Sequence, residues 1–228
     1  MIKNLSLLFV FLVAVNAISF GSDSCSCEDD NSYGGGGGGH HHGGGHGEGN
    51  RGCPEGWRRF RRSTGGWCMK VFGRINIEPE HAANACAVHG AVLSGIQNSE
   101  ERRYLLSSIG STNITAATGS LWLGAKRTDA CIGSKLTATC SKTTSFAWTD
   151  GVTTGTAGFS WLDGSQPDNA LGGRQNCIAF FFAPSNTVIA SVTWFPGAMD
   201  DVNCYSAQFI EIPQRRFHGY VCGKEATS

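Results

Sequence analysis

The chain has 228 residues, 18 basic and 18 acidic side chains, and ten cysteines. A formal net charge of zero argues against a nucleic-acid-binding protein, because such proteins need a basic surface to neutralise phosphates. With a leader and a low-complexity stretch set aside, roughly 175 residues remain, which is enough for one domain with a sizeable core.

The first 17 residues have the pattern of a secretory signal peptide. Lys3 is the only charged side chain before Asp23, residues 5–15 are apolar, and residues 15–17 offer small side chains at a cleavage position. The apolar run is shorter than the roughly 20 residues that a membrane-spanning helix needs. We therefore expect a secreted, extracellular protein without a membrane span.

Residues 22–50 are predicted to be a disordered linker. Between residues 34 and 49, eleven of sixteen positions are glycine and four are histidine, so the segment has too little apolar area to offset the entropy of ordering it. A solvated tail is favoured over a metal-binding or pH-sensitive histidine tract. Cys25 and Cys27 lie in this segment. They either link chains into a disulfide-bonded oligomer or remain free or mutually paired.

The folded part begins near Cys53 with two short strands. Residues 57–60 and 67–72 alternate in the manner of strands, and residues 63–66 form the turn between them. Four arginines cluster on the first strand, and a solvated strand face is favoured over a site for acidic glycans; these are Arg58, Arg59, Arg61 and Arg62.

Two helices are predicted next. The first begins at Pro79, a residue suited to the first helical turn, and ends by Gly90. The second opens at Asn98, with Glu101 three residues later as the partner in a capping box.

The remainder is predicted to consist of short strands and long loops. Apolar segments indicate strands at residues 121–124, 146–148, 177–182, 188–194 and 217–222. Residues 149–176 are rich in Gly, Asp and Asn, and long loops of this kind often carry function. Asn113 stands in an Asn-Ile-Thr acceptor for N-glycosylation.

Eight of the ten cysteines lie in the folded part. An even number in an oxidising compartment predicts disulfides, and eight cysteines allow 105 pairings. Zinc is disfavoured because no Cys-x-x-Cys spacing occurs.

Several short motifs follow one another in a recognisable order. They are Cys53–Trp57 with Trp67-Cys68, Trp122–Ala125, Phe146–Gly151, Trp161–Gly164 and Gln166–Asn169. In this order and with this cysteine spacing, residues 53–224 resemble the long form of the C-type lectin domain family, as in secreted invertebrate members. The resemblance implies an α+β fold with two helices, antiparallel sheets and a long loop for calcium and sugar.

The resemblance also implies how the cysteines pair. It joins Cys86 to Cys222, Cys177 to Cys204, and Cys53 to Cys68; Cys131 and Cys140 remain and are expected to close a local loop. The first of these bonds encloses most of the domain, so it should constrain the unfolded chain most strongly.

By the same resemblance, one calcium ion is held by five side chains that also grip two sugar hydroxyls. They are Gln166, Asp168, Gln175, Asp200 and Asp201, and the Gln166–Pro167 bond is expected to be cis. The family usually has Glu at position 175, Asn at 200 and Trp at 199. The three acids expected of a galactose-type set are still present, so calcium binding is expected. A second calcium ion is not assigned, because Asn169 and Asn176 stand where acids would help.

The sugar preference is less well defined than the metal. The Gln-Pro-Asp motif favours galactose-like ligands, whereas the reversed Gln175/Asp200 pair and the lack of an aromatic residue in 169–173 count against them. Alanine at Asp201 is expected to abolish sugar binding and leave the fold intact.

We therefore expect a secreted, calcium-dependent glycan-binding glycoprotein, with recognition of microbial surfaces in innate defence as the role implied by analogy. An enzyme is disfavoured, because His81, His89 and His218 lie outside any nucleophile motif. Two alternatives stay open. One is a domain of the same fold that binds proteins without calcium, and the other is a structural or mucus protein cross-linked through Cys25 and Cys27.

Overall fold

The computed structural model describes residues 50–227. The predicted signal peptide, nearly all of the predicted linker, and Cys25 and Cys27 lie outside the described residues. Within residues 50–227, none of the helices is both long enough and apolar enough to cross a membrane.

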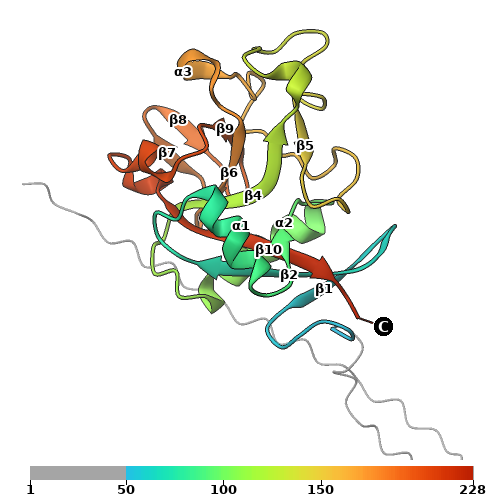
Figure 1. The fold of residues 1–228 in the computed structure, drawn as a ribbon. Helices are drawn as coiled ribbons and strands as arrows, with labels where there is room; N and C mark the ends of the chain where they lie inside the picture. The colour runs from blue at the N-terminus through green and yellow to red at the C-terminus, as the bar shows by residue number, and fades with distance from the viewer. Residues whose placement is uncertain (1–49, 228) are drawn as a thin grey trace, which may run out of the picture. The chain divides into compact units, whose positions relative to one another are not determined.

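An eight-stranded sheet runs through the domain (Figure 1). Its main path is β1 (Arg58–Arg62), β2 (Gly65–Gly73), β10 (Phe217–Glu225), β4 (Gly119–Arg127), β6 (Cys177–Phe182) and β9 (Met199–Val202). Two short strands attach to its side: β3 (Val92–Leu93) to β10, and β5 (Phe146–Trp148) to β4. The pairs are antiparallel except β10 with β4, which is parallel. The β1–β2 pair therefore lies at one end of this path, and the β6–β9 pair at the other.

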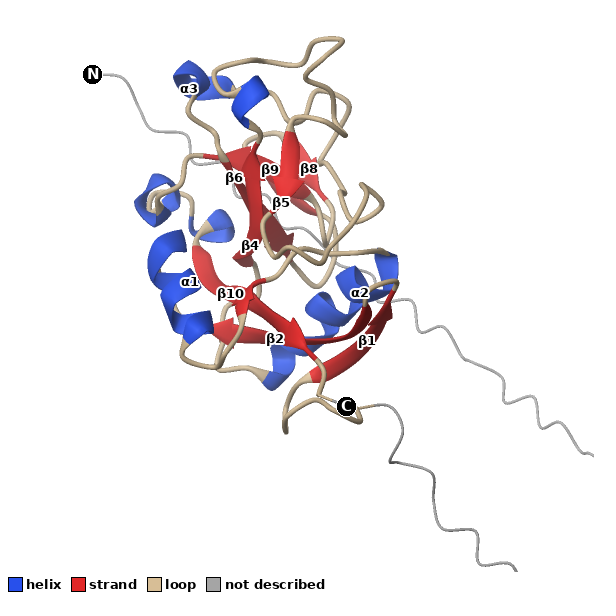
Figure 2. Cartoon of the chain, turned by 45° about the vertical axis from the view of Figure 1, so that its right-hand side comes forward, coloured by secondary structure: helices blue, strands red, loops and turns tan. Residues whose placement is uncertain are grey.

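Two helices, α1 (Pro79–Ala87) and α2 (Ser99–Ser108), lie beside the β2–β10 pair (Figure 2). Both begin where the sequence predicts. Pro79 opens α1, and the Asn98 side chain accepts from the N–H groups of Glu100 and Glu101 at 2.9 and 3.1 Å. The remaining helical segments are short: α3 (Ala170–Gly173), η1 (Ile109–Ser111), η2 (Asp129–Cys131), η3 (Ser206–Phe209) and η4 (Pro213–Arg215).

One of the four arginines on β1 departs from the solvated face predicted for it. Arg62 is buried and forms two hydrogen bonds to the carboxylate of Glu101, of 2.9 and 2.8 Å. Glu101 also accepts from the N–H of Gln97 at 2.7 Å, so its carboxylate does not close the capping box on Asn98. The physical reason is that side chains alternate along a strand, so Arg62 shares the inward face with Phe60. A buried guanidinium in turn needs a carboxylate partner.

The single strand predicted at 188–194 is also wrong. The structure has a separate two-stranded hairpin, β7 (Thr187–Ile189) and β8 (Val192–Trp194). Ala190 and Ser191 turn the chain with φ of 48° and 66°, a conformation that sequence rules reserve mainly for Gly and Asn. Val188 and Val192 are exposed, so the apolar run is not a buried strand.

The core packs against both faces of β6, which is buried along its whole length. On one side of the sheet Trp122 stacks on Phe217, with ring centroids 3.5 Å apart, and its indole N–H donates to Ile77 O at 2.8 Å. Phe181 packs against Trp194 of the hairpin. The long loop that precedes β6 is therefore attached to a strand that is buried along its whole length.

Four disulfides join the pairs that the family resemblance implied. They are Cys53–Cys68, Cys86–Cys222, Cys131–Cys140 and Cys177–Cys204. The second spans 136 positions and connects α1 to β10, while the third closes only nine. Together with the two helices and the mainly antiparallel sheet, they confirm the predicted α+β fold.

Candidate functional site

The long loop between β5 and β6 carries the predicted sugar motif. The Gln166–Pro167 peptide bond is cis, as the resemblance implied. The N–H of Asp168 donates to Gln166 Oε1 at 3.1 Å, and Asp168 Oδ1 accepts from the N–H of Ala170 at 2.9 Å. Within residues 50–227, Gln166 Nε2 and Asp168 Oδ2 have no hydrogen-bond partner, and neither atom is sealed from solvent. One donor and one acceptor are therefore left free beside the cis peptide.

The carboxylate of Asp201 accepts hydrogen bonds from the backbone of this motif. Asp201 lies in β9, opposite Ile178 of β6, and is completely buried. Its Oδ1 accepts from the N–H of Asp168 at 3.0 Å, and its Oδ2 accepts from the N–H of Asn169 at 2.8 Å. The same Oδ2 forms an ion pair with the guanidinium of Arg127. Both carboxylate oxygens thus have partners inside the protein.

Arg127, the last residue of β4, is the cation under the loop. Besides Asp201, its guanidinium donates to Gln175 O at 2.9 Å and to Ser134 O at 3.5 Å. Its planar group lies 4.6 Å from the centre of the Phe146 ring. The sequence reasoning missed this residue. The available signal was the alternation of side chains along a strand, which places Arg127 on the same face as Leu121, Leu123 and Ala125, all of them buried.

Gln175 lies at the end of the same loop and is buried. Its Nε2 donates to Asp201 O at 2.7 Å, and its N–H donates to Asn169 Oδ1 at 3.1 Å. Asn169 Nδ2 in turn donates to Ser134 O at 2.9 Å. Gln175 Oε1 is buried without a partner in the described part of the chain. Gln175 therefore supports the loop from inside, and its side-chain amide donates to the backbone of β9.

Asp200 is separated from the rest of the predicted set. Successive residues of a strand point to opposite faces, so Asp200 and Asp201 diverge. The carboxylate of Asp200 pairs with Arg215, whose guanidinium lies between Trp194 and Phe209, at 4.2 and 3.9 Å from their ring centres. The structure therefore does not bring the Asp200 and Asp201 carboxylates together, and their joint action on one ion stays a prediction.

Burial controls the electrostatics of the two adjacent acids. It raises the pKa of Asp200 to about 6, against the lowering effect of Arg215. It likewise raises the pKa of Asp201 to about 6, against the lowering effects of the Asn169 N–H and Arg127. Burial also lowers the pKa of both arginines, and the paired carboxylates oppose that shift. At neutral pH both pairs remain charged, and each acid already has its counterion.

The five predicted ligands do not fit a calcium ion as they are arranged. Calcium takes six to eight oxygen ligands, several of them from carboxylates. Here Asp200 and Asp201 are each paired with an arginine, and of the predicted acids only Asp168 has no ion pair among the described residues. Residues 50–227 contain no group of three or more His, Cys, Asp or Glu side chains placed to hold a metal. Alanine at Asp201 would also leave Arg127 charged, buried and without its carboxylate, so that variant would test the stability of the loop together with sugar binding.

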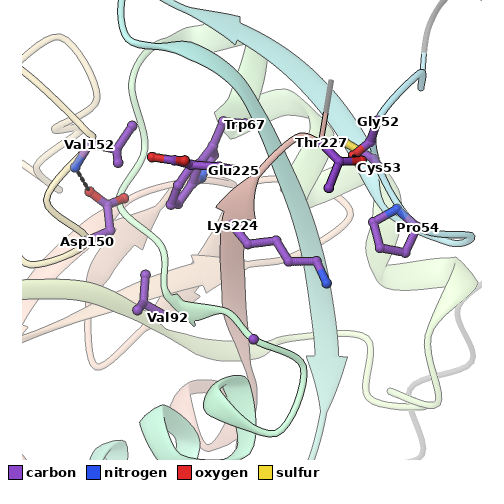
Figure 3. A pocket seen from close by; sticks show the side chains of 11 residues that line it. Gly52, Cys53, Pro54, Trp67, Val92, Asp150, Val152, Lys224, Glu225 and Thr227 are labelled. Carbon is purple, nitrogen blue, oxygen red and sulfur yellow. Dashed lines mark hydrogen bonds between the residues drawn. The ribbon is translucent and has the colours of Figure 1, made fainter.

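A separate hollow lies beside the end of β10 (Figure 3). Trp67, Asp150, Val152 and Glu225 are among the residues that line it. Its buried acid is not free to bind a ligand: Asp150 accepts from the N–H groups of Gly95, Val152 and Thr153 at 2.8, 3.0 and 2.7 Å. The cis-proline loop, where a donor and an acceptor are free, is the better candidate site.

Two of the three histidines considered in the sequence analysis pack against aromatic side chains. His89 stacks on Phe72 with ring centres 4.8 Å apart. His218 packs edge-on against Phe182 at 6.1 Å.

The fold, the four disulfides and the cis-proline loop together define a C-type lectin-like domain. A family model described as C-type lectin domain-containing protein 141/158 matches residues 59–225, and the chain therefore belongs to the C-type lectin domain family. No curated protein sequence matches the chain.

Solved structures with similar chains include sugar-binding and other members of this fold. The carbohydrate-recognition domain of cow CD23, solved in the presence of an oligosaccharide, is 21% identical, with 77% of this chain and 98% of that chain covered and a TM-score of 0.46. The Ca2+-independent C-type lectin SPL-2 from Saxidomus purpuratus is 18% identical, with 77% and 96% covered and a TM-score of 0.47. A Ca2+-dependent type II antifreeze protein is 22% identical, with 75% and 99% covered and a TM-score of 0.46.

Proposed function

We propose that this protein is a secreted glycan-binding lectin whose sugar contact is the cis-proline loop. The observation that carries the proposal is the pair of free polar atoms there, Gln166 Nε2 and Asp168 Oδ2. A sugar hydroxyl donates one hydrogen bond and accepts others, so a carboxamide N–H and a carboxylate oxygen on the same short motif can serve a single hydroxyl. Contact through one hydroxyl implies weak binding by a single site.

Each of the five predicted sugar-site residues has a place in this proposal. Gln166 and Asp168 contact the sugar, Gln175 and Asp201 hold the loop, and Asp200 anchors β9 to Arg215 on the other face of the strand. The calcium-dependent mode predicted from the sequence requires Asp201 to exchange Arg127 for a calcium ion. The geometry favours direct contact between the loop and the sugar.

Secretion is part of the proposal. It is supported by the four disulfides, which form in oxidising compartments, and by the predicted signal peptide at residues 1–17. Recognition of microbial glycans in innate defence follows by analogy, and an array that includes bacterial glycans tests it. Cross-linking through Cys25 and Cys27 is tested by gels with and without reductant. A chain that runs as a monomer in both would refute it.

The experiment is a glycan-array screen of the mature secreted protein, run once with calcium and once with a chelator. Retained binding in the chelator is the expected result. Binding that needs calcium would restore the mode predicted from the sequence, and absence of binding in both conditions would overturn the function.

A matched pair of variants places the contact. Asp168→Asn keeps the acceptor for the N–H of Ala170 but replaces a carboxylate oxygen with a donor. It should weaken glycan binding about tenfold or more, as expected for loss of a hydrogen bond to a charged group. Asp129→Asn removes an exposed carboxylate outside the loop and should leave binding unchanged. Equal binding by Asp168→Asn and the wild type would exclude this contact.

A further inference from the structure

The two neighbouring acids of β9, Asp200 and Asp201, are both buried and point to opposite faces of the strand. Arg215 pairs with Asp200 and Arg127 pairs with Asp201, while Asp168, the third acid of the predicted set, has no ion pair among the described residues. Two of the three acids that a divalent cation would need therefore already have an internal counterion that stays charged.

We infer that Arg127 supplies from within the chain the positive charge that organises the long loop, so that the loop keeps its shape without a divalent cation. The guanidinium reaches three separate segments: Asp201 in β9, Gln175 at the end of the long loop, and Ser134 in the loop between η2 and β5. A planar group with five donors suits such a position, because it satisfies several acceptors in fixed directions.

Arg127 acts on the sugar motif through its ion pair with Asp201. The oxygen atoms of that carboxylate accept from the backbone N–H groups of Asp168 and Asn169, the two residues that follow the cis peptide. Removing the guanidinium would leave Asp201 buried without its counterion, a state that is avoided by protonation or by opening of the loop. Arg127 is therefore a positioning residue. It has no part in the sugar contact itself.

This inference concerns how the loop is held, and it rests on the proposed function only in naming Gln166 and Asp168 as the groups that face the sugar. Its test measures order in the loop and not sugar binding. A chain that binds no glycan but keeps an ordered loop in chelator would refute the proposed function alone. A glycan-binding chain whose loop is ordered only with calcium would refute this inference alone.

The test is hydrogen exchange of the mature chain, followed in peptides that cover residues 165–176, in chelator and in excess calcium. Equal protection in both conditions and an unchanged Tm are the expected result. Protection that appears only with calcium, or a clear rise of Tm on adding calcium, would overturn the inference.

Variants then assign the protection to Arg127. Arg127→Gln should raise exchange in residues 165–176 about tenfold or more, because the amides of Asp168 and Asn169 lose a fixed acceptor. Arg174→Gln, which removes an exposed arginine from the same loop, should leave exchange as in the wild type. Unchanged exchange in Arg127→Gln would contradict the inference.

Two further variants keep the test decisive if Arg127→Gln fails to fold. Arg127→Lys keeps the charge but not the planar fork, so exchange should be intermediate. The double change Arg127→Gln with Asp201→Asn removes both charges of the pair. It should restore folding while residues 165–176 still exchange faster than in the wild type. Wild-type protection in the double variant would show that the ion pair does not order the loop.

Discussion

Arg62 and Arg127 are both buried, both lie at the end of a strand and both pair with carboxylates, but they stabilise different parts of the domain. Arg62 forms two hydrogen bonds to Glu101 of α2, and its Nη1 lies 3.5 Å from Asp150 and donates to Thr153 at 2.9 Å. Arg127 meets one carboxylate, that of Asp201, and otherwise carbonyl oxygens of loops. The first arginine joins elements of the core, whereas the second joins segments of the loop region. Loss of Arg62 should therefore destabilise the whole domain, and loss of Arg127 should mainly loosen the loop.

The largest expected effect comes from the disulfides of the two regions. Replacing Cys86 and Cys222 with serine opens a closure of 136 residues and should cost about 5 kcal/mol of unfolding free energy on the chain-entropy estimate. Replacing Cys131 and Cys140 opens one of nine residues and should cost about 3 kcal/mol. Denaturant unfolding of both variants measures the difference. Equal losses would show that strain in the folded state dominates over chain entropy.

Breaking the core pair comes next. Arg62→Met leaves Glu101 buried without its cation and should cost about 3–5 kcal/mol, a range typical of breaking a buried ion pair. Thermal unfolding provides the measurement, and Arg61→Met, at an exposed position on the same strand, is the control. A loss of stability no larger than that of Arg127→Gln would remove the distinction between the two regions.

The pH dependence of stability provides a further test of the core region, where Asp150 lies beside Arg62. Burial raises the pKa of Asp150. Hydrogen bonds from the side chain of Thr153 and from the N–H groups of Thr153, Val152 and Gly95 lower it by more than burial raises it, so the pKa lies below the ordinary value of 3.8. Because the folded pKa is below the unfolded value, ionised Asp150 stabilises the fold above about pH 4. That stability is lost as pH falls through the folded pKa.

Asp150→Asn should therefore cost about 1–3 kcal/mol at neutral pH and flatten the acid limb of the stability curve. Urea unfolding across a pH series measures both effects. Asp129→Asn, at an exposed site, is expected to follow the wild-type curve. An acid limb in Asp150→Asn as steep as in the wild type would contradict the assignment.

The smallest effect concerns the surface. Asn113 is exposed in the loop after η1, where a glycan can attach without disturbing the core. Asn113→Gln should lower the mass of the secreted protein by one N-glycan and change its stability little. Mass spectrometry before and after deglycosylation measures this. An identical mass for wild type and variant would show that the acceptor is unused.

The features that the sequence predicted well depend on local or ordered patterns. The caps of α1 and α2 and the apolar strand β6 follow from neighbouring residues, and the disulfides and the cis proline follow from motifs that occur in a fixed order. The 188–194 segment was mistaken because Ala190 and Ser191 adopt positive φ, which sequence rules do not expect of them.

The core of the site was less accessible to sequence reasoning. Asp200 and Asp201 look like loop residues, yet both are buried in β9. Their burial depends on partners at separations of 15 and 74 positions, which only the fold brings together. In a sequence, an aspartate that binds a metal cannot be told from one that pairs with a distant arginine. The ligand set was therefore predicted without Arg127 and Arg215, the counterions of Asp201 and Asp200.

The two ends of the described chain are neighbours. The N–H of Thr227 donates to Gly52 O at 2.8 Å, and the adjoining Cys53 is bonded to Cys68 of β2. In both views this end of the domain lies away from α3 and the cis-proline loop (Figures 1 and 2). A tag, a surface or a second copy joined at residue 50 or residue 227 would therefore be attached on the side away from α3. Several domains joined at this end would present an array of weak sites, and the avidity of such an array can exceed the affinity of any one site.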